Sequence, residues 1–197
     1  ATSLPFARQT THKKAIPMTQ RTNEFEQPVG EALPDWQPVS HPPRTPMEGR
    51  YCRTEAFDVD RHGSDLYEAY AANEDGSMWT YMPSGPFADE AAFLAWMRPA
   101  CESEDQLFYT LIDTTSGKAV GQAAYLRTTP AHGVIEVGNI AFSPRLQRTP
   151  IATEAMFLMM QRVFNELGYR RYEWKCDSCN APSRRAAARF GFTYDGL

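Results

Sequence analysis

The chain has 197 residues, of which 42% are hydrophobic and 22% are charged, and its net charge is -4. These values are typical of one soluble globular domain with or without a long tail, and they exclude wholesale disorder. No apolar run reaches the roughly 18 residues of a membrane-spanning helix. The pI near 5.6 argues against a nucleic-acid binder. We therefore expect neither a membrane nor a nucleic acid as partner.

Residues 1–46 contain eight prolines and little periodicity, which predicts a Pro-rich extended arm. The stretch up to Arg21 has basic residues and no acids, a composition that resembles a transit peptide. A disordered terminus or a tag remnant has the same composition. The globular domain is expected over 47–197.

The remaining chain alternates between strand and helix patterns. Strands are predicted over 48–57, 106–113, 118–127, 133–144 and 170–177, with another starting at 191, and helices over 62–73, 88–100, 150–167 and 181–190. This order predicts a mixed α/β (α+β) fold with a largely antiparallel sheet flanked by helices. Gly138, inside a predicted strand, indicates a bulge or a close approach by another backbone or a ligand.

The four cysteines and the lack of an apolar leader favour a reducing compartment, so a cytoplasmic location is expected. Cys176 and Cys179 form a close pair that zinc sites and redox sites also use. Neither Cys52 nor Cys101 supplies a second close pair, and the histidines are scattered. No metal is therefore expected, and a thiol redox or zinc protein is kept as an alternative.

The stretch "SPRLQRTPIATEAM", residues 143–156, joins a predicted strand to a predicted helix. Unpaired N–H groups and the positive end of the helix dipole make such a junction an anion site. Pro150 suits the first turn, which leaves the N–H groups of Arg148, Thr149, Ile151 and Ala152 as donors. From Ser143 onward the sequence has nine Arg or Lys residues and five acidic residues, and this excess of positive charge suits an anionic ligand. The alternative is an ordinary helix start that binds nothing.

Three segments within residues 48–197 resemble the Gcn5-related N-acetyltransferase (GNAT) superfamily, most closely its RimJ/RimL-type branch. They are "IEVGNIAFSP" (135–144), "QRTPIA" (147–152) and "NAPSRRAAARFGF" (180–192). Pro150 stands where the family's acetyl-CoA loop has glycine. Ala187 stands where many members carry a tyrosine, which that branch also lacks. The family fold continues beyond the last motif, so the resemblance implies that C-terminal strands are missing and that the domain over 47–197 is truncated.

The resemblance implies an acetyl-CoA-dependent N-acetyltransferase that moves the acetyl group directly to a primary amine of a protein N-terminus or a small molecule. It implies Glu136 as the base and Ser183 as the proton donor to the leaving thiolate. Residues expected to bind acetyl-CoA are Ile140, Ala141, Phe142, Gln147, Arg148, Thr149, Ile151, Ala152, Thr153 and Asn180. Residues expected to bind the acceptor are Trp79, Tyr81 and Phe87.

Each of these residues has a plainer interpretation. Glu136 is equally consistent with a solvated strand face, Asn180 with a helix cap, and Trp79 with core packing. An acyl-CoA-binding regulatory protein of the same fold, with little turnover, is the alternative to an enzyme. A sheet without its last strands exposes an edge, which makes a homodimer possible.

Overall fold

The computed structural model describes residues 21–196 of the chain. It divides into two compact units, Ala1–Trp36 and Gln37–Leu197. In the first unit, β1 (Arg21–Thr22) pairs antiparallel with β2 (Pro28–Val29). The Asn23 side chain supports the turn between them, since its Oδ1 accepts the N–H groups of Phe25 and Gln27. The transit-like stretch, except for Arg21, lies outside the described residues.

The second unit begins with a strap, residues 37–46, that is hydrogen-bonded to the domain through its carbonyl groups. The Tyr169 hydroxyl donates to the Ser40 carbonyl at 3.0 Å, and the Tyr109 hydroxyl donates to the Pro43 carbonyl at 2.5 Å. The Arg162 guanidinium donates to the carbonyls of the last two strap residues. The compact unit therefore includes the strap and starts at Gln37. The expected start of the acetyltransferase domain at residue 47 stays a prediction.

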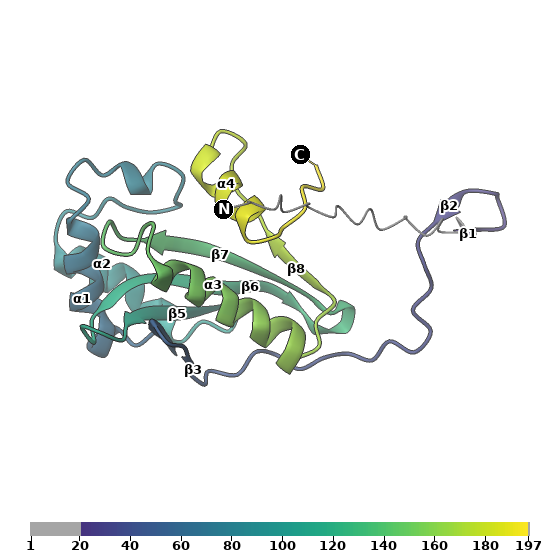
Figure 1. The fold of residues 1–197 in the computed structure, drawn as a ribbon, viewed down its shortest axis with the longest axis horizontal. Helices are drawn as coiled ribbons and strands as arrows, with labels where there is room; N and C mark the ends of the chain where they lie inside the picture. The colour runs from purple at the N-terminus through teal and green to yellow at the C-terminus, as the bar shows by residue number, and fades with distance from the viewer. Residues whose placement is uncertain (1–20, 197) are drawn as a thin grey trace, which may run out of the picture. The chain divides into compact units, whose positions relative to one another are not determined.

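A six-stranded sheet forms the centre of the second unit (Figure 1). Its strands, in spatial order, are β3 (Met47–Glu48), β4 (Cys52–Ala56), β5 (Gln106–Asp113), β6 (Ala119–Thr129), β7 (Val134–Phe142) and β8 (Arg171–Trp174). Neighbours are antiparallel except β7 and β8, which are parallel. The expected mixed, largely antiparallel sheet is confirmed. The single strand expected over 48–57 is instead two strands, because a turn at residues 49–51 interrupts it.

The helices cover both faces of this sheet. They are α1 (Val59–Ala71), α2 (Glu90–Met97), α3 (Pro150–Gln161) and α4 (Ala181–Arg189), and α3 continues into one π-helical turn over Arg162–Glu166. Alternation along β6 separates two cores: Ala124 and Leu126 pack with α1 and α2, whereas Ala123 and Tyr125 pack with α3. Within residues 21–196 no helix has the length and apolarity to span a bilayer.

The segment after α4 runs from Phe190 to Gly196 without strand pairing, so the strand expected from residue 191 is not formed there. Side-chain packing holds the segment instead. The Phe192 ring lies 5.4 Å from the ring of Tyr172, and Asp195 forms an ion pair with Arg171 at 2.7 Å. The segment therefore packs against β8 through side chains and forms no strand pairing with it.

The turn between β3 and β4 is closed by a carboxylate from α3. Glu154 accepts the backbone N–H groups of Arg50, Tyr51 and Cys52 at 2.8, 2.6 and 2.8 Å. A Cβ at Gly49 would lie 2.4 Å from Glu154 Oε2, so only glycine leaves room for this contact. Burial opposes ionisation of Glu154, but the three backbone donors prevail and lower its pKa below 4.5.

We expect Glu154→Gln to lower the free energy of unfolding by about 2 kcal/mol at neutral pH, because it removes charge-assisted hydrogen bonds. A folded-state pKa below the unfolded value of 4.5 stabilises the fold above pH 4.5, and the contribution is lost as the pH falls through the lowered pKa. Urea denaturation at several pH values measures the effect, and the exposed Glu48→Gln is the control. A difference between wild type and Glu154→Gln that did not shrink in acid would contradict the assignment.

Candidate active site

Strand β8 pairs along its whole length with the first four residues of β7, and β7 continues beyond the end of β8. Their parallel ladder runs from Val134 with Arg171 to Val137 with Trp174. Beyond it, residues 138–142 pair with β6, but no described strand pairs with them on the β8 side. The carbonyls of Ala141 and Phe142 accept hydrogen bonds from the side chains of Tyr70 and Gln147. The other backbone groups of this stretch are open to an extended ligand, as at any unpaired strand edge.

A β-bulge directs this free edge. Ala124 pairs with Gly138 and Gln122 pairs with Ala141, so Asn139 and Ile140 together oppose the single residue Ala123. Asn139 has a left-handed φ of 47°, and its amide donates to Gln106 Oε1 at 2.7 Å. The bulge expected at Gly138 is confirmed and lies directly after it.

The loop from Ser143 to Thr149 turns β7 into α3. The Ser143 carbonyl accepts the N–H groups of Leu146 and Gln147, at 2.9 and 3.0 Å, and the Gln147 amide donates to the Phe142 carbonyl at 2.9 Å. Gln147, expected to contact acetyl-CoA, therefore also shapes the loop. Arg148 follows with a φ of 62°, in the left-handed region.

Thr149 caps α3 and takes up part of the expected donor set. Its Oγ1 accepts the Ala152 N–H at 3.5 Å and donates to the Leu146 carbonyl at 2.7 Å, while its own N–H bonds to Leu146 at 3.3 Å. Of the four expected donors, the N–H groups of Arg148 and Ile151 remain for a ligand. These two N–H groups, at the positive end of α3, are the candidate anion-binding position.

Helix α4 brings Asn180 and Ser183 beside the end of β8. Asn180 is the cap of α4, and its Oδ1 accepts the Ser183 N–H at 3.1 Å. The Ser183 Oγ accepts the Trp174 Nε1–H at 2.9 Å. Because the hydroxyl accepts this bond, its own proton is left to donate elsewhere. Sequence reasoning missed Trp174, whose partner nine residues away gave no local signal.

Glu136 lies on the α1 and α2 face of β7, opposite Leu126, shortly before the pairing with β8 ends. Its side chain is 3% exposed and pairs with Arg127 at 2.5 Å and with Lys175 at 2.6 Å. Lys175 also binds Glu173 at 2.7 Å. Burial of Lys175 would lower its pKa, but its bonds to the two carboxylates outweigh this and raise it. Glu136 is thus a buried carboxylate held between two cations, not a residue on a solvated strand face.

The three aromatic residues expected to bind the acceptor occupy different environments. Trp79 is 8% exposed and packs edge-to-face with Tyr70 and Phe87, at centroid distances of 5.4 and 5.3 Å. Trp79 therefore belongs to the core, and its contact with the acceptor stays a prediction. Tyr81 is 45% exposed, and its hydroxyl donates to the Cys179 carbonyl at 3.2 Å. That bond ties the α1–α2 loop to the loop that carries Asn180.

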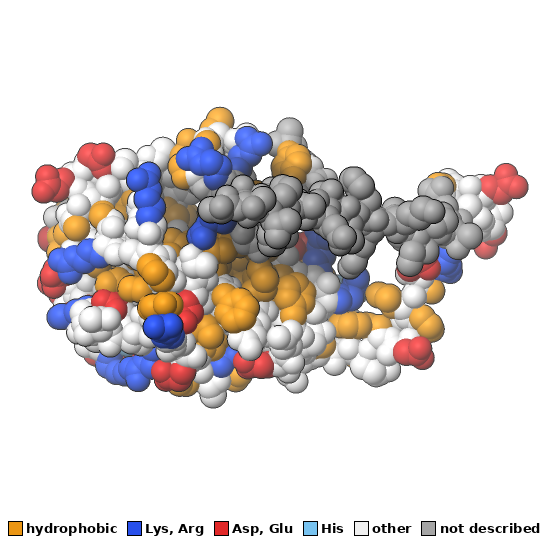
Figure 2. Space-filling model, viewed as in Figure 1, with side chains coloured by type: hydrophobic (Ala, Val, Ile, Leu, Met, Phe, Trp, Pro, Cys, Tyr) orange, Lys and Arg blue, Asp and Glu red, His pale blue; other side chains and the backbone are white. Residues whose placement is uncertain are grey.

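Basic side chains gather over α4, as Figure 2 shows. Arg189 joins α4 to the first turn of α3 through a 3.0 Å bond to Thr153 Oγ1, and Arg184 bonds to the Ser178 carbonyl. Arg148 and Arg185 are exposed and have no partner among the described residues. The surface around the anion-binding position is therefore positive, as a polyphosphate ligand requires.

The cysteines of this region are thiols. Cys176 and Cys179 are free and exposed, whereas burial, together with the nearby Glu154 carboxylate, raises the pKa of Cys52 to about 12. In the part of the chain that the structure describes, no group of three or more His, Cys, Asp or Glu side chains is placed to hold a metal ion.

Comparisons with known proteins agree with this geometry. Residues 60–193 match the family model described as acetyltransferase (GNAT) domain. A GCN5-related N-acetyltransferase from Brucella melitensis is similar, with 46% identity, a TM-score of 0.81, and coverage of 83% of this chain and 74% of that one. A probable acetyltransferase (GNAT family) from Chromobacterium violaceum is also similar, with 40% identity, a TM-score of 0.78, and coverage of 86% of this chain and 84% of that one.

More distant structures share the fold alone. Ribosomal-protein-S5-alanine acetyltransferase from Vibrio fischeri is 14% identical, with a TM-score of 0.60 and coverage of 77% of this chain and 85% of that one. No curated protein matches the chain. The matched family model, which spans most of the domain, and the two close structures show that the chain belongs to the GNAT acetyltransferase family.

Proposed function

We propose that this chain transfers the acetyl group of acetyl-CoA to a primary amine, by direct attack of the amine on the thioester. The observation that carries the proposal is the free edge of β7 leading into the capped start of α3. The edge suits the amides of a pantetheine arm, and the helix start suits its pyrophosphate. Family membership supports acyl transfer from acetyl-CoA in general.

Three groups of the chain bind and orient acetyl-CoA. The N–H groups of Arg148 and Ile151, with the dipole of α3, bind the pyrophosphate and thereby orient the thioester. The backbone of Ile140 and Phe142 lies along the free edge, where one N–H stabilises the developing oxyanion. Asn180, the N-terminal cap of α4, offers its Nδ2 to the pantetheine.

Proton transfer completes the reaction. Ammonium has no lone pair, so the amine must lose a proton before its nitrogen bonds to the acetyl carbon. Glu136 accepts that proton, directly or through water, from the α1 and α2 face of β7. When the carbon–sulfur bond breaks, Ser183 gives its hydroxyl proton to the leaving thiolate and takes up the remaining extra proton of the attacking nitrogen, so that a neutral amide and a free thiol result. Trp174 orients Ser183 for this step, since it occupies one lone pair of the hydroxyl oxygen.

The RimJ/RimL-type branch and a cytoplasmic location are finer parts of the same proposal. The segment "IEVGNIAFSP" and the alanine at position 187 support the branch. The free thiols of the chain suit a reducing compartment. A protein N-terminus and a small amine are both acceptors that this branch assignment allows.

The anion-binding position is tested by a charge placed on it. We expect Thr153→Glu to weaken acetyl-CoA binding about tenfold, because a carboxylate in the first turn repels the pyrophosphate. Thr153→Gln, which has the same size without the charge, is expected to bind nearly as wild type. Titration calorimetry at low salt compares the three proteins. Equal affinities for both variants would refute binding at this helix start.

The acyl-CoA-binding regulatory protein remains the alternative, and the same preparation separates it from an enzyme. Release of free thiol from acetyl-CoA is followed with a panel of primary amines. An enzyme releases thiol in proportion to the amine that it acetylates. Tight binding of acetyl-CoA without amine-dependent release would favour the regulatory protein.

A further inference from the structure

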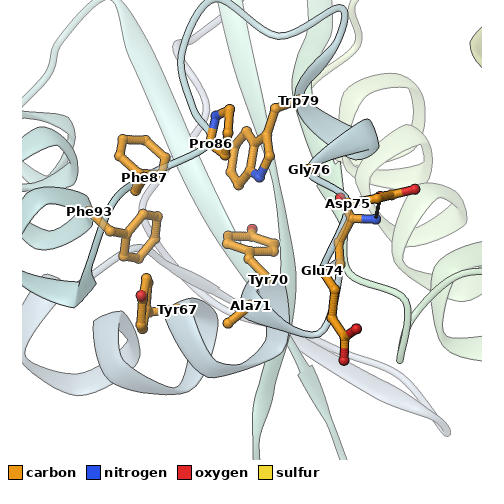
Figure 3. Close-up of a pocket in the computed structure, with 11 residues that line it drawn as sticks. Tyr67, Tyr70, Ala71, Glu74, Asp75, Gly76, Trp79, Pro86, Phe87 and Phe93 are labelled. Atoms are coloured by element: carbon orange, nitrogen blue, oxygen red, sulfur yellow. Dashed lines mark hydrogen bonds between the residues drawn. The ribbon is translucent and has the colours of Figure 1, made fainter.

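A cavity of about 320 Å³ lies between the end of α1, the loop after it and the start of α2 (Figure 3). Pockets of this size are at the lower end of those that bind small molecules. The aromatic residues that line it are Tyr67, Tyr70, Trp79, Phe87 and Phe93. Trp79 and Phe87, expected at the acceptor site, therefore do line a cavity, although Trp79 also belongs to the core.

The rings are fixed by edge-to-face packing. Tyr70 contacts Trp79 and Phe93 at centroid distances of 5.4 and 5.8 Å, and Phe87 contacts the same two rings at 5.3 Å each. A Cβ at Gly85 would lie 2.5 Å from the Trp79 ring, so glycine there permits the arrangement. Aromatic faces carry partial negative charge, so a rigid wall of rings suits a cation.

Two carboxylates complete the lining, on the side of the cavity away from Phe87 and Phe93 (Figure 3). Glu74 is exposed and has no partner among the described residues. Asp75 accepts the Ser77 N–H at 3.0 Å, and this bond lowers the pKa of Asp75. No Lys, Arg or His lines the cavity. Its field therefore attracts cations and repels anions.

The cavity adjoins the strand on which acyl transfer is proposed. The Tyr70 hydroxyl donates to the Ala141 carbonyl of β7 at 3.3 Å. Tyr70 therefore forms part of the cavity lining and also contacts the strand that carries the free edge.

We propose that this cavity binds a second positive group of the acceptor, so that the preferred acceptor carries an ammonium on a short alkyl chain besides its reacting amine. The inference rests on the proposed acetyl transfer for the position of the reacting amine. Free diamines and peptides with a lysine near the N-terminus share this chemistry. An acceptor with a carboxylate in that position is disfavoured.

Matched amines test the proposal by thiol release. We expect the KM for cadaverine to be about tenfold lower than the KM for pentylamine, with similar kcat, because ring faces and Glu74 bind only the added charge. Glu74→Gln should remove most of the difference, whereas Glu104→Gln, an exposed acid outside the cavity, should keep it. Equal KM values for the two amines would exclude a free diamine as the preferred acceptor.

Two further comparisons distinguish a free diamine from a peptide as the acceptor, and failure of the cation site from failure of acetyl transfer. The dipeptides Ala-Lys and Ala-norleucine repeat the comparison for a peptide acceptor. A difference in KM within one pair alone shows whether the preferred acceptor is a free diamine or a peptide. Calorimetry of cadaverine and pentylamine without acetyl-CoA tests the cavity apart from catalysis. If no amine is acetylated but cadaverine binds in a Glu74-dependent way, acetyl transfer fails and the cation site stands. If neither pair is discriminated in binding or turnover, the cation site is wrong.

Discussion

Glu136→Gln is expected to lower kcat about a hundredfold, the smaller end of the range for loss of a general base. The residue is 3% exposed on the α1 and α2 face of β7, just before the free edge begins. Arg127 and Lys175 hold its two oxygens, so the carboxylate is fixed in position. Glutamine keeps the shape of the side chain and cannot accept the proton of an ammonium.

The pH dependence distinguishes a base from a structural residue. Wild type should show a kcat/KM that rises with pH as the acceptor amine loses its proton, and the pH profile of the variant should differ from it because Glu136 takes part in proton transfer. Glu173→Gln is the matched control. Glu173 also binds Lys175, and it lies on β8 opposite Glu136 in the parallel ladder, so its replacement removes a carboxylate from the same cluster without removing the proposed base. An unchanged pH profile with a lower melting temperature in Glu136→Gln would mean that Glu136 only holds β7 and β8 together.

Arg162→Met is expected to lower the free energy of unfolding by about 3 kcal/mol, because several charge-assisted hydrogen bonds disappear at once. Arg162 is 4% exposed in the π-helical turn after α3. Its guanidinium donates to the carbonyls of Thr45 and Pro46 at 2.7 and 2.9 Å and to the Tyr109 hydroxyl at 3.1 Å. Methionine fills similar space and supplies none of these donors.

Urea denaturation measures this loss, with Arg98→Met as the control. Arg98 is largely exposed and makes one ion pair, with Asp60 at 3.3 Å, so its replacement should change stability by roughly 0.5 kcal/mol or less. Proteolysis within the strap, residues 37–46, should also become faster in Arg162→Met. Equal stability of the two variants would show that the strap does not depend on Arg162.

The elements that sequence predicted best are those with local determinants. The strand over 106–113 is found with the same bounds, because its apolar run ends in turn residues. Helix α3 begins at Pro150, as predicted, since proline needs no N–H partner in the first turn and Thr149 caps the helix. The bulge after Gly138 was also readable. The motifs "QRTPIA" and "NAPSRRAAARFGF" indicate the GNAT family from the sequence alone.

Only the tertiary structure decided which side chains meet. The sequence by itself determined most of the strand and helix order, the position of the junction between β7 and α3, and the family. It did not determine that Arg162 holds carbonyls 116 and 117 residues away, that Lys175 pairs with Glu136 across 39 residues, or that Tyr81 reaches the loop before α4. Nor did it place Trp79 at once in the core and in the wall of a cavity. Periodicity and capping act within a few residues, whereas these contacts depend on how the whole chain packs.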